Sequence, residues 1–322
     1  MKAIIISELG NSSVLQYKDV PEPKIEKNDV LVKNKAIGVN FIDVYHRTGV
    51  YKKELPSILG QEGAGVITQI GSEIKNFKIG DRVAYCSVND SYAEYTKVPE
   101  FRLVKLPDFV DFKQGAALML KGITAHYLLT STYPVTKGTK LLIHAAAGGV
   151  GSLVVQIAKA KGAYVIATTS TEEKIKLVKT LGADAVINYT TQDWVAEVKK
   201  LTNNVGVDVV YDSVAKSTFP GSLDCLRPRG YFVLFGQSSG VIESFNPGIL
   251  AAKGSLFMTR PSLGHYIATA EELQSRTKDL FGWLKDKKIK LLIDSEIPLA
   301  EASKAHDRLE TRQNKGEVIL TL

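Results

Sequence analysis

Hydrophobic and polar positions along this chain follow two different patterns, and the change falls near residue 124. Before it, short apolar runs alternate with turn residues such as Pro21, Pro23 and Gly80. Short strands that are not joined by helices predict a compact β-rich barrel or sandwich. The expected strands cover residues 2–7, 30–36, 65–70 and 92–98.

From residue 124 onward, apolar runs of strand length alternate with stretches of helical periodicity. This alternation predicts an α/β domain with a doubly wound, six-stranded parallel sheet. The expected strands cover 141–144, 163–167, 185–188, 207–212, 230–235 and 255–258, and the expected helices follow Gly151 and cover 172–181, 193–201 and 217–226.

The last part of the chain has no crossover pattern of its own. It reads as helices over 269–285 and 302–311 and a final strand over 317–322. We therefore expect this tail to return to the β-rich part. The predicted division is a β-rich domain over 1–123, an α/β domain over 124–260 and a return segment over 261–322.

The first strand-to-helix junction of the α/β part carries a glycine-rich turn at 145–151. Ala146, Gly148 and Gly151 occupy the three small-residue positions of the dinucleotide fingerprint. Gly148 would let the backbone approach a pyrophosphate, and Gly151 would let the new helix lie close to the sheet. The N–H groups at the helix start favour phosphate binding. The turn predicts a dinucleotide site, against the alternative of a merely tight turn.

The second strand of this part ends without an acidic residue. Sites that prefer NAD usually place Asp or Glu there, to bind the ribose 2′-hydroxyl. Instead, Ser170 and Glu173 have the spacing of a helix capping box, and Lys174 lies in the first helical turn. We expect Ser170, Thr171 and Lys174 to bind a 2′-phosphate, so NADPH is the predicted cofactor. The alternative is a solvated surface lysine.

The other cofactor contacts are predicted from the sheet alone. Ligands of doubly wound sheets bind beyond the carboxyl ends of the strands, although a single residue there is more often an ordinary loop residue. The cofactor-contacting residues expected at the turn and at the strand exits are Gly148, Gly149, Val150, Gly151, Ser170, Thr171, Lys174, Tyr189, Ser213, Val214, Phe235, Gly236, Gln237, Ser238 and Arg260.

Composition and charge narrow the class of protein. The 322 residues are 44% hydrophobic and 23% charged, as in a globular protein, and no stretch suggests a membrane span. The net charge of +7 is spread among acidic residues without a basic block, so nucleic acid is an unlikely partner. Glu8 interrupts the first apolar run, which disfavours a secretory signal. Cys86 and Cys225 form no disulfide framework, so the expected compartment is the cytoplasm.

Seven segments together resemble the zinc-independent, zeta-crystallin-like quinone oxidoreductases of the medium-chain dehydrogenase/reductase superfamily. The resemblance covers essentially the whole chain. It implies a GroES-like catalytic domain beside the Rossmann domain, and a homodimer. The matching segments are GVNFIDVY at 38–45, LGQEGAGV at 59–66, GDRVA at 80–84, LKGIT at 120–124, AAAGGVG at 145–151, VVYDSV at 209–214 and TRPSL at 259–263.

The zinc sites of the superfamily's alcohol dehydrogenases do not match this chain. Gln61 stands where their histidine precedes the acid, the early cysteine is absent from 38–43, and two cysteines cannot build a four-cysteine lobe. His46 and Glu62 could recruit a metal, an interpretation we disfavour. The sequence therefore predicts no metal.

The resemblance implies a substrate cleft that contains Asn40, Tyr45, Tyr51 and Arg260, with no acid or base assigned. It also implies cofactor contacts by Asn40, Thr124, Tyr127 and Arg312. Without a Lewis acid, the acceptor must take a hydride unaided, which fits a quinone. The alternatives are reduction of an alkenal or enone double bond and, in another class, an RNA-binding or structural crystallin-like role.

Overall fold

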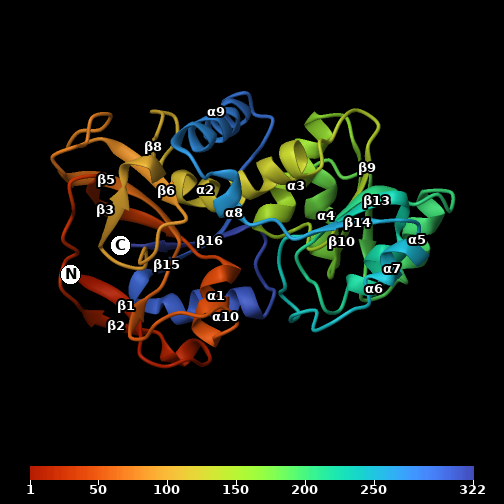
Figure 1. The fold of residues 1–322 in the computed structure, drawn as a ribbon, viewed down its shortest axis with the longest axis horizontal. Helices are drawn as coiled ribbons and strands as arrows, with labels where there is room; N and C mark the ends of the chain where they lie inside the picture. The colour runs from red at the N-terminus through yellow and green to blue at the C-terminus, as the bar shows by residue number, and fades with distance from the viewer. The chain divides into compact units, whose positions relative to one another are not determined.

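The computed structural model describes all 322 residues, which form sixteen strands and ten helices (Figure 1). The chain divides into two compact units. The first unit comprises Met1–Ile123, Tyr266–Lys285 and Leu291–Leu322, and the second comprises Thr124–His265 and Asp286–Lys290.

The second unit is built on a six-stranded parallel sheet in the order β11-β10-β9-β12-β13-β14. This is the strand order of a doubly wound dinucleotide-binding domain, so the predicted fold class is confirmed. The strands read as near-continuous apolar runs because helices cover both faces. They are β9 (Lys140–Ile143), β10 (Tyr164–Thr169), β11 (Ala185–Asn188), β12 (Val207–Asp212), β13 (Leu226–Leu234) and β14 (Phe257–Thr259).

The helices α3 to α7 of this unit lie on the two faces of the sheet (Figure 1). Residues of α5, α6 and α7 pack on Leu142, Ile166 and Phe232 in one apolar cluster. Figure 1 draws α3 and α4 on the opposite side. The helices are α3 (Gly149–Ala160), α4 (Glu172–Thr180), α5 (Trp194–Leu201), α6 (Phe219–Asp224), α7 (Gly248–Ala252) and α8 (Leu263–Tyr266).

Two predicted strand starts in this unit are wrong, and backbone conformation explains both. The sixth strand begins at Phe257 and not at Ser255, because Gly254 and Ser255 adopt left-handed backbone angles that a strand does not accommodate. The fifth strand begins earlier than expected, at Leu226. It contains Arg229 with φ of 60°, and its register against β12 shifts near this end.

The first unit contains a seven-stranded and a three-stranded sheet. The larger sheet runs β15-β16-β3-β5-β6-β8, with β7 also paired to β3, and the smaller runs β2-β1-β4. Pairing of β16 with β3 confirms that the tail returns to the β-rich part. The strands are β1 (Lys2–Ile6), β2 (Gln16–Asp19), β3 (Asp29–Gly38), β4 (Ser57–Ile58), β5 (Glu62–Ile70), β6 (Arg82–Cys86), β7 (Tyr95–Pro99), β8 (Leu103–Lys105), β15 (Ile293–Pro298) and β16 (Glu317–Thr321).

Helices in the β-rich part are the main feature that the sequence pattern did not predict. One of them, α1 (Phe41–Thr48), begins after Asn40, whose N–H donates to Asp43 Oδ2 at 2.8 Å, and it ends at left-handed Gly49. The other unpredicted helix is α2 (Phe112–Tyr127), whereas α9 (Ala270–Lys285) and α10 (Ala302–Glu310) confirm the two helices predicted in the tail. No helix of the protein has the length and apolar content that crossing a membrane requires.

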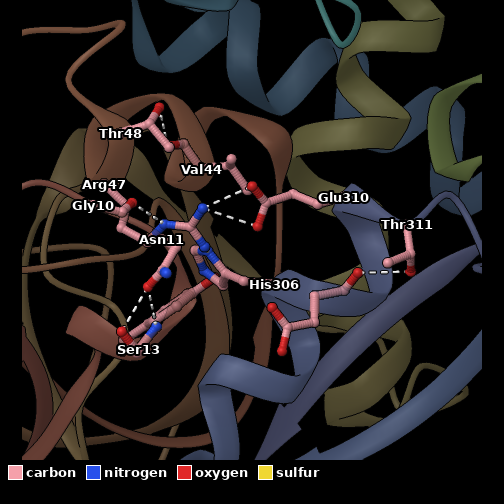
Figure 2. Close-up of polar contacts among 11 residues, drawn as sticks. Gly10, Asn11, Ser13, Val44, Arg47, Thr48, His306, Glu310 and Thr311 are labelled. Carbon is pink, nitrogen blue, oxygen red and sulfur yellow. Dashed lines mark hydrogen bonds and ion pairs between the residues drawn. The ribbon is translucent and has the colours of Figure 1, made fainter.

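A buried chain of hydrogen bonds joins α1 to α10. Figure 2 shows Arg47 between Glu310 and His306, with both Glu310 oxygens within 2.9 Å of Arg47 Nη2. Arg47 Nη1 lies 3.2 Å from His306 Nδ1, and a guanidinium only donates, so Nδ1 accepts. The ring proton is therefore on Nε2, which donates to the Tyr92 hydroxyl at 3.1 Å, and Tyr92 donates to Asp43. This series of hydrogen bonds fixes the tautomer of His306, with the ring proton on Nε2.

His306 is held neutral by this environment. Burial lowers its pKa to about 3, and the neighbouring Arg47 charge acts in the same direction. The unfolded chain therefore binds a proton at this residue in the window between pH 6.5 and 3, and the folded chain does not. Stability is lost as pH falls through that window.

We expect the His306 ring to remain neutral between pH 7.5 and 5.5, and folding to lose about 1.4 kcal/mol of stability from this residue over that interval. Nitrogen-15 NMR of the ring measures the first effect. Urea unfolding of the wild type and of His306→Gln at both pH values measures the second. A ring that titrates near 6.5, or a pH dependence unchanged in His306→Gln, would contradict this account.

Candidate cofactor and substrate sites

The glycine-rich turn after β9 starts the candidate cofactor site of the second unit. Ala145 adopts a left-handed conformation with φ of 52°, and the Ala146 N–H donates to Thr168 O on the neighbouring strand exit. A Cβ on Gly151 would lie 2.4 Å from Ala145 O, so only glycine allows this approach. A Cβ on Gly148 would be 3.3 Å from the same oxygen, a milder but still tight contact that requires the backbone to shift by a few tenths of an ångström.

The turn leads directly into α3, whose N-cap residue is Gly148. The first N–H groups of a helix have no partners within it, and here they belong to Gly149, Val150 and Gly151. Together with the helix dipole, they form an arrangement suited to a phosphate. The residues at this turn therefore fit a dinucleotide.

The capping interaction predicted at the exit of β10 is wrong by one residue. Thr171, not Ser170, is the N-cap of α4, and its hydroxyl accepts from the Lys174 N–H at 3.3 Å. The reason is conformational, because Thr171 is the last extended residue before the helix. Lys174 is consequently the third residue of α4, beside an N-terminus that favours an anion. Ser170, Thr171 and Lys174 thus lie together after one strand exit. The strand itself ends without an acidic residue, and Glu172 and Glu173 belong to the first turn of α4.

Asp212, at the end of β12, holds the loop that follows this strand through hydrogen bonds. Its Oδ1 accepts from the N–H groups of Val214 and Ala215, at 2.7 and 3.0 Å. Its Oδ2 accepts from the hydroxyls of Thr218 and Ser222, at 2.7 and 3.0 Å. A fully buried carboxylate with four donors fixes the shape of the loop after β12.

The loop after β13 is fastened to the loop after β12. The Ser238 N–H donates to Ser213 O at 3.0 Å, and a Cβ on Gly236 would lie 2.8 Å from the same oxygen. Gln237 Oε1 accepts from Arg260 Nη2 at 2.9 Å, which links this loop to the exit of β14. The predicted residues Ser213, Gly236, Gln237 and Arg260 therefore form one connected edge.

His144 connects the glycine turn to this edge, which the sequence did not suggest. Its Nδ1 lies 2.9 Å from the Thr168 hydroxyl, and its Nε2 lies 3.1 Å from the Ser222 hydroxyl. Since the Ser222 hydroxyl donates to Asp212, it accepts from His144 Nε2–H. His144 is buried, and burial lowers its pKa. The neutral ring of His144 therefore links the exits of β9, β10 and β12 through hydrogen bonds.

In the first unit, α1 gathers the predicted substrate residues. Asn40 is its N-cap, Tyr45 lies within it, and Tyr51 follows its end. The two tyrosine rings pack edge-on with centroids 5.2 Å apart, and the Tyr51 N–H donates to Tyr45 O. The structure thus groups these three residues through local structure alone.

Asn40 also touches a buried charged cluster, which consists of Glu62, Lys121 and Glu317. Asn40 Nδ2 donates to Glu62 Oε1 at 2.8 Å. Lys121 Nζ lies 2.6 Å from Glu317 Oε2 and 3.6 Å from Glu62 Oε1. All three charged side chains are at least nine-tenths buried. Burial raises the pKa of Glu62 and of Glu317, and Lys121 opposes both shifts.

Comparison with known proteins identifies the family. Residues 26–108 match the alcohol dehydrogenase GroES-like domain, and residues 149–281 match the zinc-binding dehydrogenase domain. A quinone oxidoreductase of Pseudomonas aeruginosa is 45% identical over 321 residues, which cover 99% of each chain. The chain belongs to the quinone oxidoreductase family of the medium-chain dehydrogenase/reductase superfamily.

Two further comparisons extend this assignment. The crystal structure of Escherichia coli quinone oxidoreductase complexed with NADPH matches with a TM-score of 0.98 and 42% identity, covering all of both chains. A 2-haloacrylate reductase of a Burkholderia species is 40% identical, over 99% of this chain and 98% of the relative. The family resemblance and the GroES-like character of the first unit are therefore confirmed.

The side chains of this protein do not form the zinc-binding site of the superfamily's alcohol dehydrogenases. No three His, Cys, Asp or Glu residues lie together in a way that could hold a metal ion. Gln61 Nε2 donates to Asn89 Oδ1 at 2.6 Å, and Glu62 is occupied by Asn40 and by the Leu120 N–H. The donor set therefore does not fit the catalytic zinc of an alcohol dehydrogenase.

The remaining predicted residues are placed as follows. Thr124 and Tyr127 are buried residues of the last turns of α2. Tyr189 is 38% exposed directly after β11, and Phe235 follows β13, where its N–H donates to Asp212 O. Arg312 lies in a left-handed position after α10, in the first unit. Their contacts with a cofactor stay predictions.

Sequence reasoning missed the buried charged cluster and the hydrogen bonds made by His144. A signal for the cluster exists, because Glu62, Lys121 and Glu317 each interrupt an apolar or small-residue stretch. A charge in such a stretch must be paired once it is buried. The partners, however, are separated by up to 255 residues along the chain, from Glu62 to Glu317, so the sequence alone does not pair them.

Proposed function

We propose that this protein is an NADPH-dependent quinone reductase that works without a metal. The observation that carries the proposal is the full-length likeness to the NADPH complex of the Escherichia coli enzyme. The residues of this chain support it, because the glycine turn, the α3 N-terminus and a β10 strand that ends without an acidic residue suit a phosphorylated dinucleotide.

In the proposed complex, Gly149, Val150 and Gly151 donate their N–H groups to the pyrophosphate. Ser170, Thr171 and Lys174 bind the 2′-phosphate, with the ammonium as the main counter-charge. The nicotinamide half binds at the edge made by the exits of β12, β13 and β14, which comprises Ser213, Val214, Phe235, Gly236, Gln237, Ser238 and Arg260. The remaining proposed cofactor contacts are Thr124, Tyr127, Tyr189 and Arg312. When bound, NADPH supplies a hydride.

The substrate residues in this proposal position a flat acceptor and stabilise its oxygens. Tyr45 and Tyr51 provide aromatic contacts and hydroxyl donors, and Arg260 provides positive charge. A quinone that takes up a hydride and one proton leaves as a hydroquinone, and the proton comes from water. Both cysteines are free and buried, which agrees with the reducing cytoplasm as the proposed compartment.

Reduction of a conjugated carbon–carbon double bond is the second candidate. The same hydride geometry serves it, and the Burkholderia relative is named a 2-haloacrylate reductase. It differs in chemistry, because the adjacent carbon must then receive a proton from a positioned donor.

We also propose a homodimer formed through the edge of the six-stranded sheet. β14 is the last strand, and its Phe257 is 51% exposed although it stacks on Tyr231 with centroids 4.7 Å apart. An apolar sheet edge readily pairs with a copy of itself around a two-fold axis.

Phe257→Lys should shift the protein from dimer to monomer in sedimentation velocity, because it introduces repelling charges at that edge. Phe109→Lys is the matched control, since Phe109 is 47% exposed in the other unit. A wild type that sediments as a monomer contradicts the dimer.

Lys174→Glu should weaken NADPH binding by at least about tenfold and change NADH binding little, since one charge-assisted hydrogen bond contributes roughly 1.5–3 kcal/mol. Fluorescence titration with both nucleotides measures this. Lys176→Glu makes the same charge change at an exposed position of the same helix and serves as control. Equal losses for NADPH and NADH would show that Lys174 does not contact the 2′-phosphate.

The reaction itself is tested by NADPH oxidation with 1,4-benzoquinone, naphthoquinones, 2-alkenals and 2-haloacrylate. We expect the quinones to give the highest kcat/KM, because they accept a hydride without a carbon-directed proton donor. Metal analysis of the same preparation accompanies the assay. Turnover of the alkenals or of 2-haloacrylate alone would replace the leading proposal by the second candidate, and stoichiometric zinc would overturn the metal-free mechanism.

A further inference from the structure

The amide of Asn40 has a fixed orientation, and its oxygen receives no hydrogen bond within the chain. The oxygen faces the Asp43 N–H at the start of α1, but that N–H donates to the backbone oxygen of Asn40 at 3.0 Å. Asn40 Nδ2 faces two acceptors, Glu62 Oε1 at 2.8 Å and Gly38 O at 3.4 Å. A flipped amide would place an oxygen against both. Asn40 is 3% exposed, and its Oδ1 is buried without a hydrogen-bond donor. A buried acceptor without a donor is unfavourable unless a ligand or a water supplies one.

Glu62 holds the amide in this orientation because every polar group around its carboxylate donates. The Leu120 N–H donates to Oε2 at 2.7 Å, and the Lys121 ammonium lies 3.6 Å from Oε1. No acceptor is positioned to receive a proton from the Glu62 carboxyl group, so the ionised form is the one these partners fit. The space is closed on the remaining side, where a Cβ on Gly38 would lie 2.2 Å from Oε1.

We propose that Glu62 is a positioning residue that makes Asn40 present a hydrogen-bond acceptor, and that this acceptor binds the hydroxyl group of the reduced substrate. The inference rests on the proposed function, in which Asn40 contacts the acceptor molecule. It adds a chemical preference. A quinone carries only carbonyl acceptors, whereas its hydroquinone carries O–H donors, so Asn40 Oδ1 selects the reduced form.

This preference assigns Asn40 a place in the reaction. As the substrate oxygen gains its proton from water, the new O–H group can donate to Asn40 Oδ1. The interaction is absent with the quinone and present with the product. It therefore contributes to the stabilisation of the protonated product and not to the initial binding of the quinone.

Replacing Glu62 by glutamine should reverse the orientation of the Asn40 amide, so that it presents a hydrogen-bond donor to the ligand instead of an acceptor. In Glu62→Gln, the Leu120 N–H attracts the new side-chain oxygen to the position of Oε2, so the new NH2 group points at Asn40. Asn40 must then turn its oxygen inward to accept from that group, and it presents Nδ2 to the ligand. Glu317→Gln is a matched control, because it removes the same charge from beside Lys121 without touching Asn40.

The experiment compares two inhibitors, 1,4-hydroquinone and its dimethyl ether, which share a ring but differ in O–H donors. Inhibition constants are measured under anaerobic conditions against 1,4-benzoquinone and NADPH. The wild type should prefer hydroquinone by about tenfold, as expected for one buried hydrogen bond. Glu62→Gln should lose or invert this preference, and Glu317→Gln should keep it.

The possible outcomes separate this inference from the proposed function. The positioning role would be overturned if Glu62→Gln and the wild type had the same ratio of inhibition constants for hydroquinone and its dimethyl ether. It would also be overturned if Glu62→Gln and Glu317→Gln lost the preference for hydroquinone equally. Equal inhibition of the wild type by both compounds would overturn it too, and would leave an internal water as the partner of Oδ1. If Asn40→Ala changes neither kinetic nor inhibition constants, the assignment of Asn40 to the substrate site fails instead. Should Glu62→Gln not fold, Asn40→Leu removes the acceptor directly and should abolish the preference.

Discussion

The burial of Lys121 between two carboxylates is the interaction on which the first unit depends. Glu62 begins β5, Lys121 belongs to α2 and Glu317 begins β16, so three distant parts of the chain meet there. Isolated buried charges are costly, and loss of one partner from such a pair typically destabilises a protein by roughly 3–5 kcal/mol. The ammonium therefore requires the tail to return, and it also supports the carboxylate that orients Asn40.

The second unit depends on a geometric constraint and not on a pair of charges. In a parallel sheet all strands end at one edge, where loops of different origin must share space. Asp212 and His144 solve this with hydrogen bonds that run from the exit of β12 to the exits of β9 and β10. Since the Thr168 hydroxyl donates to His144, and the Ser222 hydroxyl accepts from His144 and donates to Asp212, the loops are fixed relative to each other before any nucleotide binds.

The sequence predicts the elements governed by local rules and misses those governed by distant contacts. Alternation of strands and helices was enough for the six-stranded sheet, and the glycine spacing was enough for the turn at 145–151. The α1 helix was missed because its eight residues carry no long apolar repeat, and its start depends on Asp43 receiving the Asn40 N–H. The shifts at Ser170 and Ser255 are single-residue conformational choices, which local composition does not determine.

The histidines give a further argument about the class of acceptor. His306 and His144 each have both ring nitrogens engaged within buried chains, and burial lowers both pKa values. Neither can supply a proton without breaking its chain. Reduction of an alkene requires a proton delivered to a carbon atom, for which positioned acids are the usual solution. A quinone places the new charge on oxygen, which water protonates readily. His306 and His144 are therefore not the proton donor that reduction of an alkene would need, whereas reduction of a quinone needs no such donor.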